Sequence, residues 1–246
     1  MRLLLLVFLL LSGCGQASRA DEIHIAVASN FAVAARQLAR RFEMDTGHEV
    51  SLSPGSTGKQ YAQIRHGAPF HAWLAADSRR PEQLEREGRI QPGSRFTYAR
   101  GRLVLWSPDP ELVDARGEVL RKGDFRHLAI ANPRLAPYGL AARQLLQKLG
   151  LWQVLAHRLV QGENIGQAFR FVRSGNAELG LVAASQVLPG SGRKNGSFWV
   201  PPADLYEPIE QQAVLLRDNE AARAFLAFVA GDEGRAIIGA NGYQLP

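Results

Sequence analysis

Four short segments of the chain carry residues that could bind an anion through hydrogen-bond donors. Each combines a hydroxyl, an amide or a glycine with the expected start of a helix; the segments are Ser29–Asn30, Ser56–Thr57–Gly58, Pro137–Tyr138–Gly139 and Asn164–Ile165–Gly166. A helix start offers unpaired backbone N–H groups and roughly half a positive charge. Several starts that meet at one point therefore form an anion site without Lys or Arg. Any one turn alone could be only a helix cap, but four together favour a ligand site.

The elements that must position these turns alternate between strands and helices. Apolar and β-forming residues alternate over 22–28, and a helical apolar face begins at Phe31. The sequence predicts strands over 22–28, 48–53, 72–75, 96–106, 127–131, 158–160, 179–183 and 209–216, and helices over 31–46, 59–66, 81–88, 138–149, 165–172, 219–229 and 232–238. This order predicts an α/β fold of two units, each a mainly parallel sheet flanked by helices. In such sheets ligands bind at the carboxyl ends of the strands, where the four turns lie.

The common catalytic and nucleotide-binding motifs are not found in the sequence. The stretch 55–59 (GSTGK) resembles a phosphate-binding loop, but Ser53 and Gln60 stand where that loop needs Gly and Ser or Thr. There is no G-x-S-x-G, no H-E-x-x-H, and the six histidines lack metal-ligand spacing. We therefore expect no enzyme, no cofactor and no metal site made of protein ligands.

The N-terminus reads as a secretory leader over residues 1–20. A basic start is followed by an apolar run over 3–11 and then by small residues. Cleavage before Cys14, the only cysteine, would leave a lipid-bearing N-terminus, whereas cleavage after Ala20 would leave a freely soluble protein. Either reading predicts an exported protein without disulfides.

Length and charge limit the partners. A chain of 246 residues can form two modest lobes with sizeable cores. Two of the 29 basic residues lie in the leader, which leaves 27 basic against 23 acidic residues and a net charge near +4. The basic residues are scattered among acidic ones, so we expect no binding of nucleic acid and no membrane contact except through a lipid on Cys14.

Motifs in a fixed order carry a resemblance to a known family. They are Ala28–Ser29–Asn30, Gly55–Ser56–Thr57–Gly58–Lys59, Tyr61–Ala62–Gln63–Ile64, Gly67–Ala68–Pro69, Ala75–Ala76–Asp77, Asn132–Pro133, Ala136–Pro137–Tyr138–Gly139, Leu146–Gln147–Lys148–Leu149–Gly150 and Glu163–Asn164–Ile165–Gly166–Gln167–Ala168. From residue 22 to the C-terminus the chain resembles the substrate-binding proteins of molybdate ABC transporters. The resemblance implies a two-lobed, type II periplasmic binding protein with a hinge. It implies a periplasmic monomer that delivers molybdate or tungstate to a permease and its ATPase. We assign residues 21–100 plus 211–246 to one lobe and 101–210 to the other.

The resemblance also implies which residues hold the ligand. By the family's pattern the oxyanion contacts Ser29, Asn30 and Thr57 from one lobe, and Tyr138 and the N–H of Ile165 from the other, so that molybdenum is held through its oxygens. Thr57 stands where the family usually has Ser. The segment 182–184 lacks the tyrosine that many members place there, and we expect Tyr138 to supply that donor through its hydroxyl or its N–H. The alternatives are a binding protein for another tetrahedral oxyanion such as sulfate, and an exported hydrolase.

Overall fold

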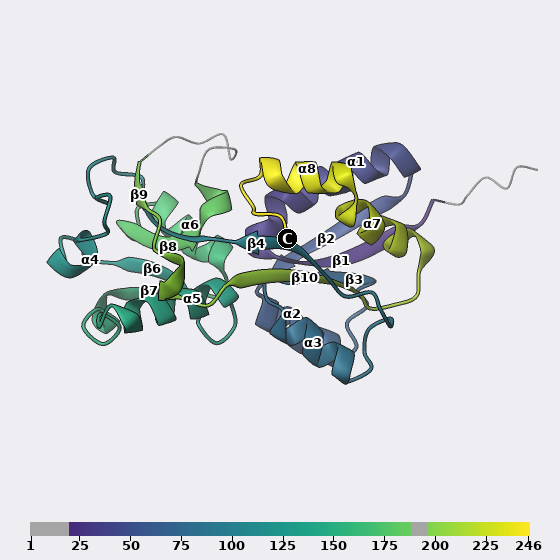
Figure 1. The fold of residues 1–246 in the computed structure, drawn as a ribbon, viewed down its shortest axis with the longest axis horizontal. Helices are drawn as coiled ribbons and strands as arrows, with labels where there is room; N and C mark the ends of the chain where they lie inside the picture. Colours follow the sequence, from purple (N-terminus) through teal and green to yellow (C-terminus); the bar gives the residue numbers. More distant parts are fainter. Residues whose placement is uncertain (1–19, 188–195) are drawn as a thin grey trace, which may run out of the picture.

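Two five-stranded sheets form the cores of two lobes in the computed structural model, which describes residues 20–187 and 196–246 (Figure 1). Cys14 and the rest of the leader up to residue 19 lie outside the described residues. We call the lobe that contains the first strand lobe 1 and the other lobe 2. In the described residues no helix is both long and apolar enough to cross a membrane.

Lobe 1 is built on a sheet with the strand order β2-β1-β3-β10-β4. Its strands are β1 (Glu22–Ala28), β2 (Glu49–Gly55), β3 (Ala72–Leu74), β4 (Phe96–Gly101) and β10 (Ile209–Leu215). β1 pairs in parallel with β2 and β3, while β10 pairs antiparallel with β3 and β4. One strand of the five therefore runs against the others, and the prediction of a mainly parallel sheet is confirmed for this lobe.

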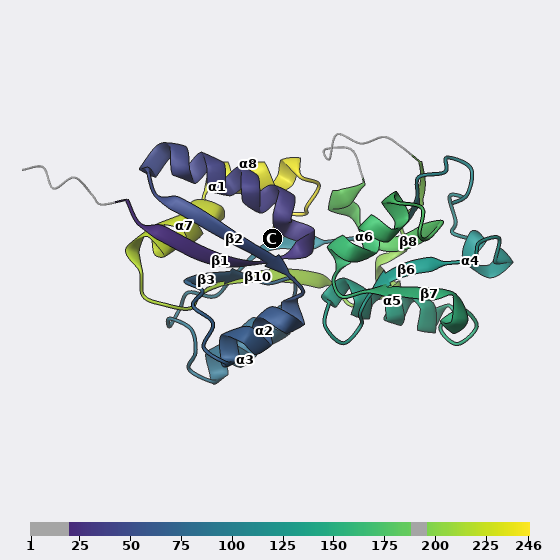
Figure 2. The same cartoon turned by 180° about the vertical axis from the view of Figure 1, so that it is seen from behind.

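Helices cover both faces of this sheet (Figure 2). They are η1 (Ser29–Phe31), α1 (Ala32–Thr46), α2 (Thr57–Arg65), α3 (Arg79–Arg86), α7 (Glu220–Ala230) and α8 (Asp232–Ala240). α1, α7 and α8 pack on one face, where Leu38 and Phe42 of α1 share a core with Phe225 of α7. α1 ends at Thr46 because Gly47 takes a left-handed φ of 73°. α2 and α3 cover the opposite face.

Lobe 2 repeats the arrangement with the strand order β7-β6-β8-β5-β9. Its elements are β5 (Leu103–Ser107), α4 (Val119–Lys122), β6 (Leu128–Ala131), α5 (Pro137–Lys148), η2 (Ala156–Arg158), β7 (Leu159–Gly162), α6 (Ile165–Arg173), β8 (Leu179–Ala183), η3 (Ala184–Gln186), β9 (Ser197–Trp199) and η4 (Ala203–Leu205). β6 pairs in parallel with β7 and β8, and β5 runs antiparallel to β8 and β9. The short elements α4 and β9 were not expected from the sequence pattern. Most of the expected loop at 189–196 lies outside the described residues.

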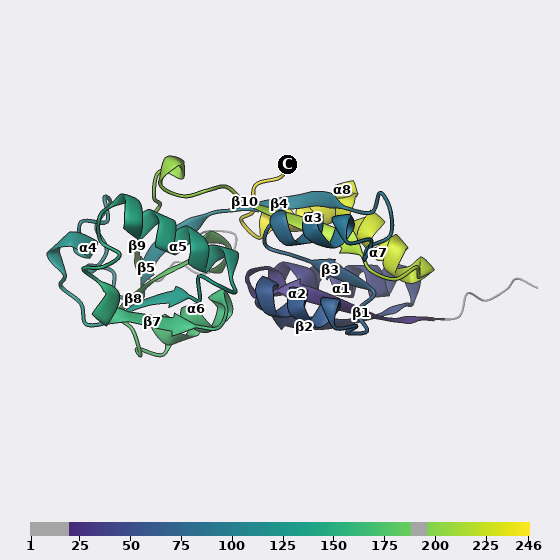
Figure 3. The ribbon, with the colours of Figure 1, turned by 90° about the horizontal axis from the view of Figure 1, so that it is seen from below.

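The chain passes between the lobes at two places (Figure 3). The apolar run 96–106, expected as one interrupted strand, is two strands in different sheets, because β4 ends at Gly101 and β5 begins at Leu103. The chain returns after Tyr206 and enters lobe 1 as β10. These neighbouring crossings form the connection about which the lobes can bend.

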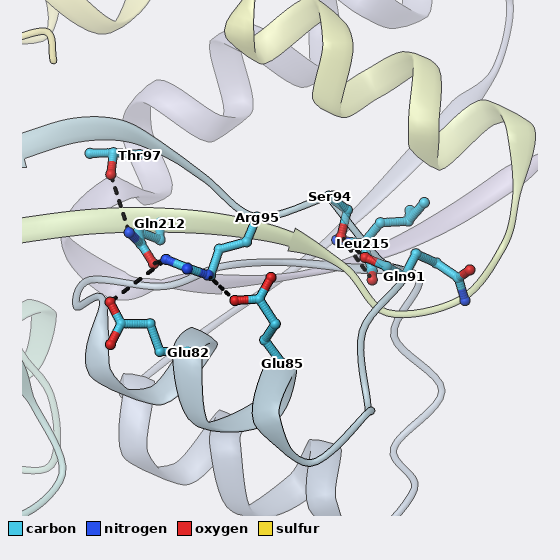
Figure 4. Close-up of polar contacts among 8 residues, drawn as sticks. All are labelled: Glu82, Glu85, Gln91, Ser94, Arg95, Thr97, Gln212 and Leu215. Atoms are coloured by element: carbon cyan, nitrogen blue, oxygen red, sulfur yellow. Dashed lines mark hydrogen bonds and ion pairs between the residues drawn. The ribbon is translucent and has the colours of Figure 1, made fainter.

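A set of polar contacts holds α3 against the sheet of lobe 1 (Figure 4). Arg95 donates through Nε to Glu85 at 2.7 Å and through Nη1 to the side-chain oxygen of Gln212 at 3.0 Å. Nη1 also lies 3.6 Å from a carboxylate oxygen of Glu82. α3 is thereby fastened to β10, one of the strands that joins the lobes.

Candidate functional site

The four turns identified in the sequence meet at one small cavity between the lobes. Its lining residues are Ser29, Asn30, Gly55, Ser56, Thr57, Ala76, Ala136, Pro137, Tyr138, Asn164 and Ile165. All five predicted site residues are among them. Residues separated by up to 136 positions in the chain thus line a single volume.

The repeated topology explains why these turns meet. In lobe 1 the turns follow the parallel strands β1 and β2, and in lobe 2 they follow β6 and β7, which hold the equivalent places in their sheet. The carboxyl ends of both pairs of strands face the other lobe. The helices α2, α5 and α6 therefore begin at the cavity. The first N–H groups of a helix have no partner within the helix, so such groups are available near the cavity.

Ser29 and Asn30 have different tasks on the wall of lobe 1. The Ser29 hydroxyl oxygen accepts a hydrogen bond from the N–H of Gly166 in lobe 2 at 3.2 Å, and its own proton is left to donate. The Asn30 side chain donates to Gln211 at 2.8 Å and to the Tyr243 hydroxyl at 3.2 Å. The side-chain amide of Asn30 is therefore engaged within lobe 1, and the group that remains to bind a ligand is the backbone N–H of Asn30.

Two neighbouring hydroxyls begin α2. Thr57 is 1% exposed, and its hydroxyl oxygen accepts from the N–H of Ala76 at 3.2 Å, so the hydroxyl proton remains to donate. Ser56, 2% exposed, has a buried hydroxyl with no hydrogen-bond partner among the described residues, and it does not cap the helix. A buried unpaired hydroxyl is costly unless something else binds it. The sequence interpretation assigned the contact of this turn to Thr57, as the resemblance to the family implies, and did not include Ser56.

Lobe 2 presents the starts of α5 and α6. Pro137 is the first residue of α5 and has no N–H, so Tyr138 provides the first backbone donor of that helix. The Tyr138 hydroxyl accepts from Nε2 of Gln211 at 3.5 Å. It also lies over Gly101, where a Cβ would come within 2.1 Å of it. In α6 the side chain of Asn164 caps the helix, and the N–H of Ile165 is the first of the helix. Because the hydroxyl lies against Gly101 and Gln211 of lobe 1, whereas the N–H of Tyr138 lies at the helix start, the structure favours this backbone N–H as the group that faces a ligand.

The described residues that line the cavity carry no formal charge. None of its lining residues is an acid, a histidine, a lysine or an arginine. Burial raises the pKa of Tyr138 well above its usual range, so the phenol stays protonated. In the described part of the chain no three His, Cys, Asp or Glu side chains gather in a way that could hold a metal ion. A set of neutral donors at three helix starts suits an anion that only accepts hydrogen bonds.

The lobes touch around the cavity. The N–H of Gly58 donates to the carbonyl of Leu135 at 2.7 Å, and the Ser185 hydroxyl of lobe 2 donates to the Tyr243 hydroxyl of lobe 1 at 3.0 Å. At the rim, Lys59 forms an ion pair with Glu163 at 3.2 Å. The structure is therefore that of a closed form, in which a ligand would be enclosed from both sides.

A wider groove adjoins the cavity between α1 and α6 and shares Ser29 and Asn30 with it. Arg36, Arg170 and Arg173 line this groove, and among the described residues no Asp or Glu does. The approach to the cavity on this side is therefore positively charged.

Known proteins are similar to this chain over almost its whole length. The family model described as bacterial extracellular solute-binding protein matches residues 23–244. The chain is 52% identical over 232 residues to the molybdate-binding protein ModA of Azotobacter vinelandii, covering 93% of this chain and 92% of that protein. It is 46% identical to ModA of Rhodobacter capsulatus, covering 95% of this chain and 92% of that protein. The fold matches the solved Azotobacter vinelandii periplasmic molybdate-binding protein with a TM-score of 0.88 at 46% identity, over 91% of this chain and 99% of that one.

Proposed function

Because the chain belongs to the bacterial extracellular solute-binding proteins, we propose that it binds molybdate or tungstate between its lobes and delivers the oxyanion to an ABC transporter. The resemblance indicated by the sequence motifs is confirmed by the identity to the two ModA proteins. The observation that carries the proposal at the site is the buried cavity lined by neutral donors at three helix starts.

The donors are sufficient to hold a dianion without a counter-charge. Six groups are available, namely the hydroxyls of Ser29, Ser56 and Thr57 and the backbone N–H groups of Asn30, Tyr138 and Ile165. Hydrogen bonds to a charged partner contribute about 1.5–3 kcal/mol each, so six supply roughly 9–18 kcal/mol. Nanomolar binding corresponds to about −12 kcal/mol, which lies within that range.

The same donors determine which oxyanions fit. A fully deprotonated tetrahedral oxyanion accepts hydrogen bonds at every oxygen, whereas protonated phosphate would set an O–H against a donor. Sulfate has the charge and shape of molybdate but is smaller, so cavity size must separate the two. We expect at least a thousandfold preference for molybdate and tungstate over sulfate, or about 4 kcal/mol.

Calorimetric titration of the purified protein with molybdate, tungstate, sulfate and phosphate tests this function. Tight binding of the first two and weak binding of the others is the expected result. Equal affinities for sulfate and molybdate would favour the general oxyanion binder. Turnover of simple ester or phosphate substrates would favour the hydrolase instead.

We propose the same cellular setting that the sequence predicts. The protein acts in the periplasm as a monomer and hands its ligand to a permease coupled to an ATPase, in a binding role rather than a catalytic one and with no cofactor. Cys14 carries a lipid anchor if the leader is cleaved before it. Metabolic labelling with a fatty acid, compared between the natural chain and Cys14→Ser, decides between the anchored and the soluble form.

A further inference from the structure

Outside the ligand cavity, lobe 1 holds one short loop of lobe 2 at two adjacent carbonyl groups. The loop is 132–136, which connects β6 to α5. Inside the loop the Asn132 side chain accepts from the N–H of Arg134 at 2.9 Å, and the Asn132 carbonyl accepts from the N–H of Ala136 at 2.9 Å. The loop is therefore a tight turn whose carbonyls at Arg134 and Leu135 are free to face lobe 1.

Arg80 makes the first of the two contacts. Its side chain pairs with Asp77 on lobe 1, and Nη2 donates to the carbonyl of Arg134 at 3.2 Å. Arg80 is only 9% exposed, and the backbone N–H of Arg80 also donates to Asp77 at 3.1 Å. Contacts within lobe 1 thus fix the position of the guanidinium. The helix α3, which carries Arg80, is in turn held against β10 (Figure 4).

Gly58 makes the second contact, and it requires the absence of a side chain. Its N–H donates to the Leu135 carbonyl at 2.7 Å. A Cβ at Gly58 would lie 2.8 Å from that carbonyl oxygen and 3.0 Å from the Cα of Leu135. Gly58 does not have a positive φ and lies inside α2, so the helix itself does not need glycine here. The close approach of the Leu135 backbone in lobe 2 is what requires glycine at this position.

We propose that Gly58, Arg80 and Asp77 form a clasp that holds the closed form and places the start of α5 over the ligand. The inference rests on the proposed function. Arg80 and Asp77 do not line the cavity, so they are positioning residues that act through Tyr138, the third residue after the clasped Leu135. Contacts that exist only when the lobes are closed shift the equilibrium between open and closed forms towards closure. The clasp therefore slows ligand release without touching the ligand.

The test compares Gly58→Ala and Arg80→Lys with Arg79→Gln, an exposed neighbour that serves as the matched control. Release of molybdate is measured by stopped-flow fluorescence, compaction on binding by small-angle scattering, and melting of the ligand-free protein by calorimetry. Gly58→Ala should release molybdate at least about tenfold faster and compact less than the natural protein. It should melt no lower without ligand, because alanine is the better helix former. Arg80→Lys keeps the positive charge but lacks the planar guanidinium that contacts Asp77 and the Arg134 carbonyl together, so it should also release molybdate faster. Arg79→Gln should release molybdate at the natural rate.

Wild-type release rates and compaction in Gly58→Ala would overturn the clasp, even if Arg80→Lys failed to fold. A lower melting temperature of ligand-free Gly58→Ala would overturn it as well, because the glycine would then serve the fold rather than closure. Failure of the natural protein to bind molybdate would instead refute the proposed function, and the same release comparison would be made with sulfate.

Discussion

Replacing Thr57 by valine removes one hydroxyl and keeps the branched shape of a side chain that is 1% exposed. In the structure the hydroxyl oxygen accepts from the N–H of Ala76 at 3.2 Å, and the proton is left for the ligand. Two separable losses follow. A buried anionic oxygen without its donor costs about 1.5–3 kcal/mol, which weakens binding about 10–150-fold. The orphaned Ala76 N–H lowers the free energy of unfolding by about 1–3 kcal/mol whether or not ligand is present.

Both losses can be measured on one pair of variants. Isothermal titration with molybdate gives the affinity, and calorimetry of the ligand-free protein gives the melting temperature, which should fall by about 2–4 °C per kcal/mol lost. Thr57→Ser is the matched control, because it keeps the hydroxyl and should keep both properties close to those of the natural protein. If Thr57→Val melts lower but binds molybdate as tightly as before, the hydroxyl only supports Ala76, and our placement of a ligand oxygen beside it is wrong.

Four further outcomes are expected. Ser56→Ala should lose affinity but not stability: among residues 20–187 and 196–246 its hydroxyl has no hydrogen-bond partner, so molybdate affinity should fall about tenfold or more while the ligand-free melting temperature stays the same or rises. A drop in both would contradict a ligand role. Tyr138→Phe should change affinity less than about threefold, since the hydroxyl lies against Gly101 and Gln211 rather than at the helix start. A loss of about tenfold or more by titration would assign the contact to the hydroxyl instead. The double variant Arg170→Gln/Arg173→Gln should slow molybdate association roughly 2–10-fold at low salt and change the release rate little, because the groove would lose positive charge that attracts anions. An equal effect at high salt would argue against electrostatic steering of the anion. Burial raises the pKa of Tyr98 and Tyr138 well above their usual range. Above about pH 10 the unfolded chain therefore loses protons that the folded protein keeps, and the free energy of unfolding should fall as the pH rises. Denaturant titrations that show no fall between about pH 9 and 11 would contradict the burial of these phenols.

The local elements and the family were accessible from the sequence alone. The alternation over 22–28, the helical face that follows it and the glycine at position 47 depend on residues a few positions apart, so their pattern predicts β1 and α1 directly. The four turns were recognised for the same reason, since strand ends, caps and helix starts are local features. The order of the motifs was specific enough to indicate the family.

Tertiary structure decided what each group at the site does. The run 96–106 reads as one strand, yet β4 and β5 belong to different sheets because their pairing partners, β10 and β8, lie far along the chain. Asn30 looks like a ligand residue, but its amide is taken by Gln211, 181 positions away. Ser56 stands at a helix start, where serine is often a cap, but its hydroxyl finds no hydrogen-bond partner in the described part of the chain and lies beside the cavity. A local pattern specifies backbone conformation, whereas hydrogen-bond partners and the space beside Gly58 depend on segments that only folding brings together.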